Sequence, residues 1–190
     1  MKLSMRKCLL IVCFLPFFIS SASAAVVPFP ELCASGTPAQ IRAAILDGAD
    51  IVERNSEGVT PLMFAAAGNP DPLAASELLD AGASLTERDY AGLTPLMWAA
   101  ARNEEPQVSA LLLQRGAEVN ARSRDGVTPL LFAAGNNENP EIASLLLKAG
   151  ADKDAKNRSG WSAFMFAAAN NPNPEILRVL RSRGADPNAR

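Results

Sequence analysis

The stretch Gly92-Leu-Thr-Pro-Leu-Met-Trp-Ala-Ala-Ala101 is one of four similar segments in this chain of 190 residues. Its neighbours, each 34 residues away, are Gly58-Val-Thr-Pro-Leu-Met-Phe-Ala-Ala-Ala67 and Gly126-Val-Thr-Pro-Leu-Leu-Phe-Ala-Ala-Gly135. Two further series of residues also recur every 34 positions. One consists of the prolines Pro38, Pro72, Pro106, Pro140 and Pro174, and the other of the glycines Gly48, Gly82, Gly116, Gly150 and Gly184. Such constant phase indicates one supersecondary unit that is copied and stacked.

Each copy predicts two short helices. The first begins at Thr-Pro, where the hydroxyls of Thr60, Thr94 and Thr128 can accept a hydrogen bond from a free backbone N–H. Proline suits the first helical position, because an N–H there would have no partner within the helix. Its Leu-Met-Phe-Ala-Ala-Ala run is apolar on nearly every side, so we expect it to be buried between neighbouring copies. The second helix begins at the proline series and ends at the glycine series in a left-handed cap.

The first and last copies differ from the others, as capping copies should. In the first, the leading helix is reduced to residues 28–34 and the second helix runs from Pro38 to Leu46. In the last, Ser162-Ala163 replaces Thr-Pro. The predicted repeats, in a single domain over residues 25–190, cover about residues 25–57, 58–91, 92–125, 126–159 and 160–190.

Residues 1–24 have the pattern of a secretory signal peptide. Three basic residues precede an apolar run over residues 8–19, and Ala22-Ser23-Ala24 offers a small-residue cleavage site. We therefore predict cleavage after Ala24 and a periplasmic or secreted protein with no membrane span. An uncleaved anchor is the alternative, and a lipoprotein reading through Cys13 is weaker because Val12 is bulky.

Composition excludes several classes of function. The chain holds 18 basic and 20 acidic residues, and loss of three basic residues with residues 1–24 leaves 15 against 20, a net charge of −5. This balance argues against nucleic-acid binding. Histidine is absent and there is no glycine-rich phosphate loop, so we expect no catalytic residue, metal or cofactor, and no enzyme activity. Cys33 would be the one cysteine left, either a small core residue or a reactive thiol.

The Thr-Pro-Leu, Ala-Ala, Leu-Leu and Gly-Ala-Asp motifs resemble the ankyrin repeat from about residue 29 to the end. The resemblance implies an all-α solenoid of about five stacked helix-turn-helix units, caps included, joined by short β-hairpin fingers. Two features depart from the family pattern. The repeat has 34 residues instead of 33, with the extra residue in the loop between the helices. The histidine of Thr-Pro-Leu-His is replaced, so we expect apolar packing in place of a Thr–His ladder at Met63, Met97, Leu131 and Met165.

The resemblance also implies a partner-binding concave face made of finger tips and inner helices. Its predicted residues in this chain are Arg54, Glu57, Arg88, Tyr90, Arg102, Arg122, Arg124, Asn136, Lys156, Arg158, Trp161 and Asn170. Arg54, Arg88, Arg122 and Lys156 form a row of one cation per repeat, which suits an acidic partner; the alternative is a solvated row paired with nearby carboxylates. The side chains of Tyr90 and Trp161 either bind the partner or pack locally, and the sequence leaves both alternatives open. Trp98, in contrast, is expected in the core.

These features favour an exported, monomeric protein that binds another protein non-covalently, as an adaptor, an inhibitor or a protective partner. An immunity protein that neutralises a toxin is the alternative. A weak hydrolase or an accessory subunit of an enzyme fits the residues less well.

Overall fold

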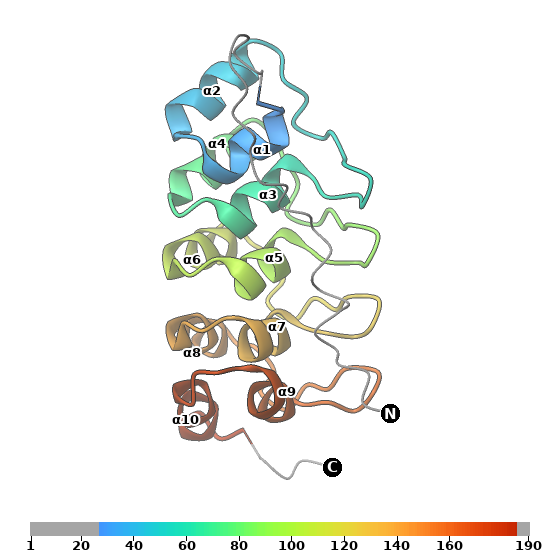
Figure 1. Cartoon of the computed structure of the whole chain (residues 1–190), viewed down its shortest axis with the longest axis vertical. Helices are drawn as coiled ribbons and strands as arrows, with labels where there is room; N and C mark the ends of the chain where they lie inside the picture. The colour runs from blue at the N-terminus through green and yellow to red at the C-terminus, as the bar shows by residue number, and fades with distance from the viewer. Residues whose placement is uncertain (1–26, 186–190) are drawn as a thin grey trace, which may run out of the picture.

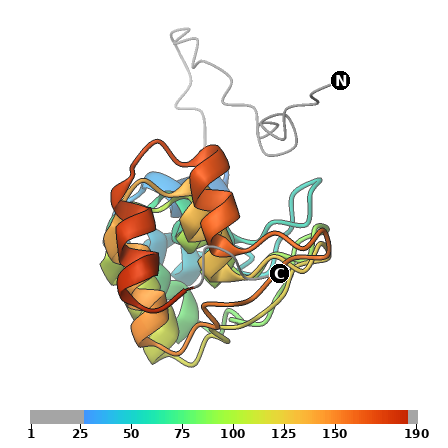
Figure 2. The same ribbon diagram turned by 90° about the horizontal axis from the view of Figure 1, so that it is seen from below.

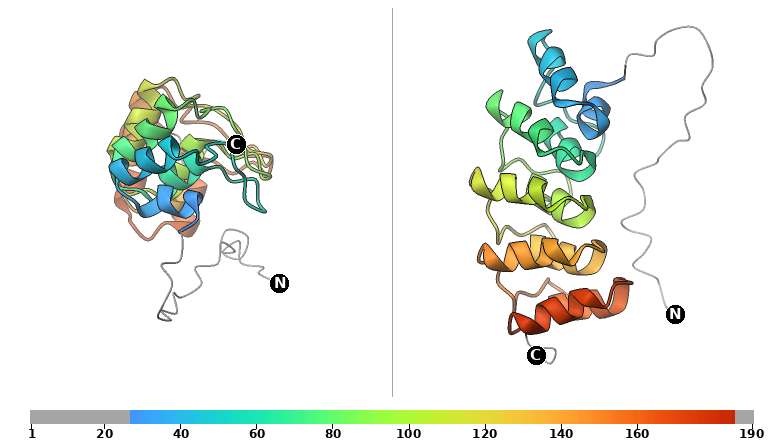
Figure 3. Two further views of the ribbon diagram at one scale, coloured as in Figure 1. Left: turned by 90° about the horizontal axis from the view of Figure 1, so that it is seen from above. Right: turned by 90° about the vertical axis from the view of Figure 1, so that its left-hand side faces the viewer.

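The structure, a computed structural model, describes residues 27–185, so the predicted signal peptide lies outside the described residues. Ten described helices form five antiparallel pairs stacked along one axis (Figures 1 and 3). The inner column consists of α1 (Phe29–Ser35), α3 (Pro61–Gly68), α5 (Pro95–Arg102), α7 (Pro129–Asn136) and α9 (Ala163–Asn170). The outer column consists of α2 (Pro38–Leu46), α4 (Pro72–Asp80), α6 (Pro106–Gln114), α8 (Pro140–Lys148) and α10 (Glu175–Ser182).

The local signals for helix starts and stops act as predicted. The Thr94 hydroxyl accepts a hydrogen bond from the Met97 N–H at 3.4 Å, and Thr60, Thr128 and Ser162 cap their helices in the same way. Beyond the end of α4, Gly82 takes a left-handed φ of 101°, which suits a residue without a Cβ. Two boundaries differ by one residue, because Pro28 and Pro174 serve as N-caps and α1 and α10 start one position later.

The all-α solenoid is confirmed, but its fingers contain little β-structure. Among the described residues, the fingers show one isolated antiparallel bridge, between Lys156 and Ser162. Within residues 27–185, no helix has the length and apolar character needed to cross a membrane.

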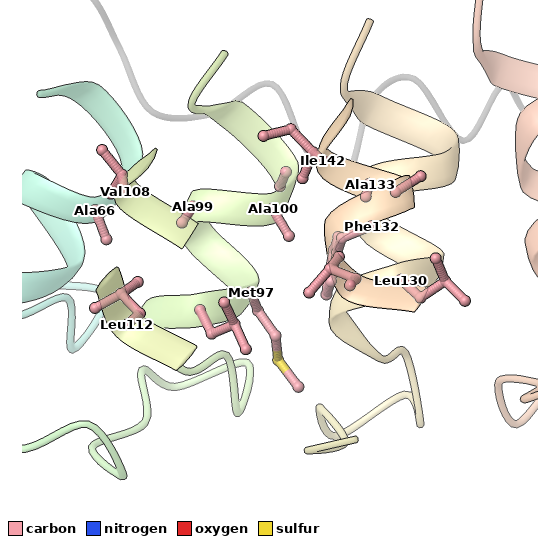
Figure 4. Close-up of a cluster of buried hydrophobic side chains, with 14 of the residues drawn as sticks. Ala66, Met97, Ala99, Ala100, Val108, Leu112, Leu130, Phe132, Ala133 and Ile142 are labelled. Atoms are coloured by element: carbon pink, nitrogen blue, oxygen red, sulfur yellow. The ribbon is translucent and has the colours of Figure 1, made fainter. Parts of the chain in front are cut away.

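The core runs without interruption from one repeat to the next. Small alanines such as Ala66, Ala99 and Ala133 let the inner helices approach closely, while Leu112 of α6 and Ile142 of α8 fill the space between the inner and outer helices (Figure 4). Met63, Met97 and Leu131, at the position where the family has histidine, are completely buried. Apolar packing at this position is therefore confirmed for the interior repeats, whereas Met165 in the last repeat is 40% exposed.

A polar ladder also runs through the stack, at a place where the sequence predicted only a loop. The loop between the two helices of a repeat contains a buried asparagine, as at Asn103. Its Nδ2 donates to the carbonyl oxygens of Ala66 (3.0 Å) and Asn69 (2.8 Å) in the preceding repeat, and its Oδ1 accepts from the Glu105 N–H (2.9 Å). Asn69, Asn137 and Asn171 repeat the arrangement. The expectation that apolar packing alone replaces the lost ladder is therefore incomplete.

Removal of one rung of this asparagine ladder should destabilise the fold. The N103A substitution leaves two carbonyl groups and the Glu105 N–H without partners, so we expect the free energy of unfolding to fall by about 2 to 4 kcal/mol. Asn136 is the matched control, because it is exposed and its amide has no hydrogen-bond partner among the described residues. In denaturant titrations, N136A should stay within about 0.5 kcal/mol of the parent protein. Equal effects of the two substitutions would contradict the role of the ladder.

Ser109 on α6 places an unpaired polar group in the apolar core. Its hydroxyl is fully buried and has no hydrogen-bond partner, whereas the equivalent positions of α4 and α8 hold the buried alanines Ala75 and Ala143. We expect S109A to raise the free energy of unfolding by about 1 kcal/mol, since a buried unpaired hydroxyl is unfavourable. The reverse change, A143S, should lower it. Thermal unfolding of both variants checks the pair, and a destabilised S109A would refute the explanation.

Candidate protein-binding surface

Four fingers project from one side of the helical stack. Viewed along its axis, the three later fingers overlap and the first lies beside them (Figure 2). We define fingers 1 to 4 as residues 53–59, 87–93, 121–127 and 155–161. Each tip is closed by a side chain that accepts backbone hydrogen bonds, as in finger 2, where Asp89 Oδ1 accepts from the Ala91 N–H (2.9 Å) and the Leu93 N–H (2.8 Å). Asn55, Ser123 and Asn157 hold the equivalent positions.

Neighbouring fingers are bonded to each other through their tips. The Tyr90 N–H donates to the Glu57 carbonyl at 2.9 Å, and the Arg124 N–H donates to the Ala91 carbonyl at 3.0 Å. The Arg158 N–H continues the series to the Asp125 carbonyl at 2.9 Å. The tips therefore form a connected surface in which each finger is held by the next.

The predicted row of cations forms a second link between the fingers. Arg88 Nη1 donates to the Gly92 carbonyl in its own finger (2.9 Å) and to the Arg122 carbonyl in the next (2.8 Å). Arg54 and Arg122 make the same pair of bonds, and the Lys156 carbonyl accepts the last one. We call Arg54, Arg88 and Arg122 with their carbonyl partners the arginine ladder. These guanidinium groups are thus structural as well as charged.

The alternative of a row neutralised by nearby carboxylates holds at one position. Arg54 Nη2 forms an ion pair with Glu87 of finger 2. Among the described residues, no carboxylate forms an ion pair with Arg88 or Arg122. The two middle guanidinium groups therefore bond to backbone carbonyls but to no carboxylate of the described residues.

Tyr90 is 58% exposed at the tip of finger 2. Its ring lies against Gly58 of finger 1, since a Cβ added to that glycine would lie 2.8 Å from Tyr90 Cδ1. It therefore contacts the neighbouring finger and still offers an aromatic surface to solvent. Arg124 and Arg158 occupy the equivalent tip positions, and both are exposed.

The match to known sequences agrees with this geometry. The family model described as ankyrin repeats (3 copies) matches residues 32–123 and residues 100–190. The chain belongs to the ankyrin-repeat family. A comparison with curated proteins gives no significant match.

Trp98 has a role in this ankyrin-repeat surface that its sequence position did not reveal. It packs against the core, as expected, but it stays half-buried and its Nε1 donates to Asp89 Oδ2 at 3.1 Å. The Arg102 guanidinium lies 5.9 Å from the centre of the Trp98 ring. The available signal was that Trp98 follows the tip residue Asp89 by nine residues, while the equivalent pairs of positions combine asparagine or serine with phenylalanine.

The remaining predicted site residues do not form one cluster. Trp161 lies edge to face with Phe166, with ring centroids 5.5 Å apart, so local packing accounts for its position. Arg102, Asn136 and Asn170 are the last residues of α5, α7 and α9, and each inner helix follows its finger, so they lie at the helix end away from the fingers. Glu57 is exposed at the tip of finger 1. The use of all these residues in binding stays a prediction.

Other candidate sites of the ankyrin-repeat domain carry little chemistry. Burial raises the pKa of the Cys33 thiol to about 12, which favours the core residue over a reactive thiol. A polar hollow beside the ends of α3 and α5 is lined by Gly68, Arg102 and Glu104, among others. Within residues 27–185, no group of three or more Cys, Asp or Glu side chains is placed to hold a metal ion.

The arginine ladder should contribute to stability. The R88A substitution removes two hydrogen bonds to backbone carbonyls, so we expect the free energy of unfolding to fall by about 1 to 2 kcal/mol. Arg124 provides the matched control, because it is an exposed arginine of the next finger whose guanidinium has no hydrogen-bond partner among the described residues. Denaturant titration of R124A should show a change within about 0.5 kcal/mol. If both variants unfold alike, the ladder has no energetic role.

Proposed function

We propose that this chain binds another protein non-covalently through the surface formed by its fingers and inner helices, as an adaptor, an inhibitor or a protective partner. The observation that supports this most is the bonding between fingers at both the tips and the arginine ladder. A surface that is already ordered loses little conformational entropy on association, so more of the contact energy remains for affinity.

Charge favours an acidic partner for this surface. Arg88, Arg122, Arg124 and Arg158 are exposed on fingers 2 to 4, and none of them forms an ion pair among the described residues. Such charges speed association and select partners more than they add affinity. We further propose that the protein acts as a monomer after export to the periplasm or the medium, on the basis of the signal-like residues 1–24.

We propose no catalytic role for the carboxylates of the fingers, because several already have partners. Asp89 accepts hydrogen bonds from two backbone N–H groups and the Trp98 indole, and Glu87 pairs with Arg54. A weak hydrolase is thus less favoured. An immunity protein that neutralises a toxin would use the same surface, and the identity of the captured partner decides between these roles.

Capture with matched charge reversals tests the proposal. The purified protein carrying R124E and R158E should lose a partner from an extract of the native envelope, whereas a variant with K148E and R181E on the outer helices should retain it. All four positions are exposed, so both variants should keep the parent melting temperature. Mass spectrometry identifies the captured protein. Equal capture by both variants would remove the fingers from the binding site.

A further inference from the structure

The charge of the fingers changes along the stack. Finger 1 carries Glu53, Arg54 and Glu57, a net charge of −1, and finger 2 carries Glu87, Arg88 and Asp89, also −1. Finger 3 carries Arg122, Arg124 and Asp125, a net charge of +1, and finger 4 carries Lys156 and Arg158, a net charge of +2. Asp154, just before finger 4, pairs with Lys153. The net charge of the binding surface therefore changes along the stack, from negative at fingers 1 and 2 to positive at fingers 3 and 4.

One contribution to the difference in charge between the ends comes from a single repeat position. Glu87 of finger 2 pairs with Arg54 of finger 1, so a carboxylate of the chain itself occupies Arg54 Nη2. At the equivalent positions of the next two fingers stand Ala121 and Ala155, both small and buried. Arg88 and Arg122 have the same Nη1 bonds to carbonyls as Arg54 but receive no such carboxylate.

We infer that an acidic segment of a partner protein, in extended conformation, lies along fingers 2 to 4 and places one carboxylate against Arg88 and another against Arg122. This inference rests on the proposed function and names the chemistry that the surface recognises. The Glu87 carboxylate beside Arg54 shows, within the same molecule, how a carboxylate meets a guanidinium whose Nη1 is held by carbonyls. Arg124 and Arg158 at the tips add positive charge beside the same path.

The repeat spacing sets the spacing of the partner's carboxylates. Packed helices lie about 8 to 10 Å apart, so successive rungs of the arginine ladder are separated by roughly that distance. A segment in the extended polyproline II conformation advances about 3.1 Å per residue and has three residues per turn, so every third side chain faces the same way. Carboxylates should therefore recur at about every third residue of the bound segment.

Two substitutions of opposite effect test this geometry without removing any arginine. The A121E substitution supplies Arg88 with an internal carboxylate at the position equivalent to Glu87, so it should compete with an acidic segment. The E87A substitution frees Arg54 and should add one cation to the path. The probe is a fluorescent peptide of five Glu-Ser-Ser units, compared with a Gln-Ser-Ser peptide and with a peptide of equal charge whose five glutamates are contiguous.

We expect the evenly spaced glutamate peptide to bind more tightly than both comparison peptides. In fluorescence anisotropy, its Kd should rise about three- to fivefold in A121E and fall by a similar factor in E87A, as for exposed ion pairs. Circular dichroism and melting temperatures show that both variants are folded. If A121E is destabilised, the gain in E87A alone decides. Unchanged affinity in the folded variants would overturn the inference, and so would equal binding of the evenly spaced and contiguous glutamate peptides.

The outcome separates this inference from the proposed function. If the fingers capture a native partner but the glutamate peptide does not bind, the acidic segment is refuted and protein binding stands. If the peptide binds with the expected response to A121E and E87A but charge reversal at the tips does not affect capture, the carboxylate site stands and the proposed use of the fingers falls.

Discussion

The stack depends on a buried amide that reaches back by one repeat. Asn103 satisfies two carbonyl groups in the loop and helix end of the preceding repeat, and it also holds the N–H of Glu105 at the start of α6. Carbonyls at the end of a buried helix need partners, because a buried polar group without one is strongly unfavourable. The extra residue in each loop lies in the segment that makes these hydrogen bonds to the preceding repeat.

The fold is linked in two separate places, with the apolar core between them. The asparagine ladder joins the loops at one end of the inner helices, and the arginine ladder joins the fingers at the other. Both use side chains of one repeat to bind backbone carbonyls of its neighbour. A rotation of one repeat against the next would break bonds of both kinds, so the fingers keep their spacing, and a rigid surface of this kind suits recognition of a partner protein.

The parts of this structure that depend on local chemistry could be predicted from the sequence. Thr94 and Pro95 start α5 because capping involves only residues within one turn, and Gly82 follows the end of α4 for the same reason. The ladders could not be predicted in this way. Asn103 looked like an ordinary loop residue, since nothing nearby shows which carbonyls of the previous repeat lie within reach. The periodicity of Arg88 predicted a row of charge but not its bonds to carbonyl groups.

Apart from the arginine ladder, which contributes to both, stability and the proposed recognition have different physical origins in this protein. The repeats are held by buried alanine and leucine side chains and by hydrogen bonds to carbonyls, which salt screens little. The charges available to a partner, such as Arg124 and Arg158, are exposed, and interactions between exposed charges weaken strongly as ionic strength rises. The tips can thus differ in charge from finger to finger, from Glu57 at one end to Arg158 at the other, while the scaffold that spaces them stays the same.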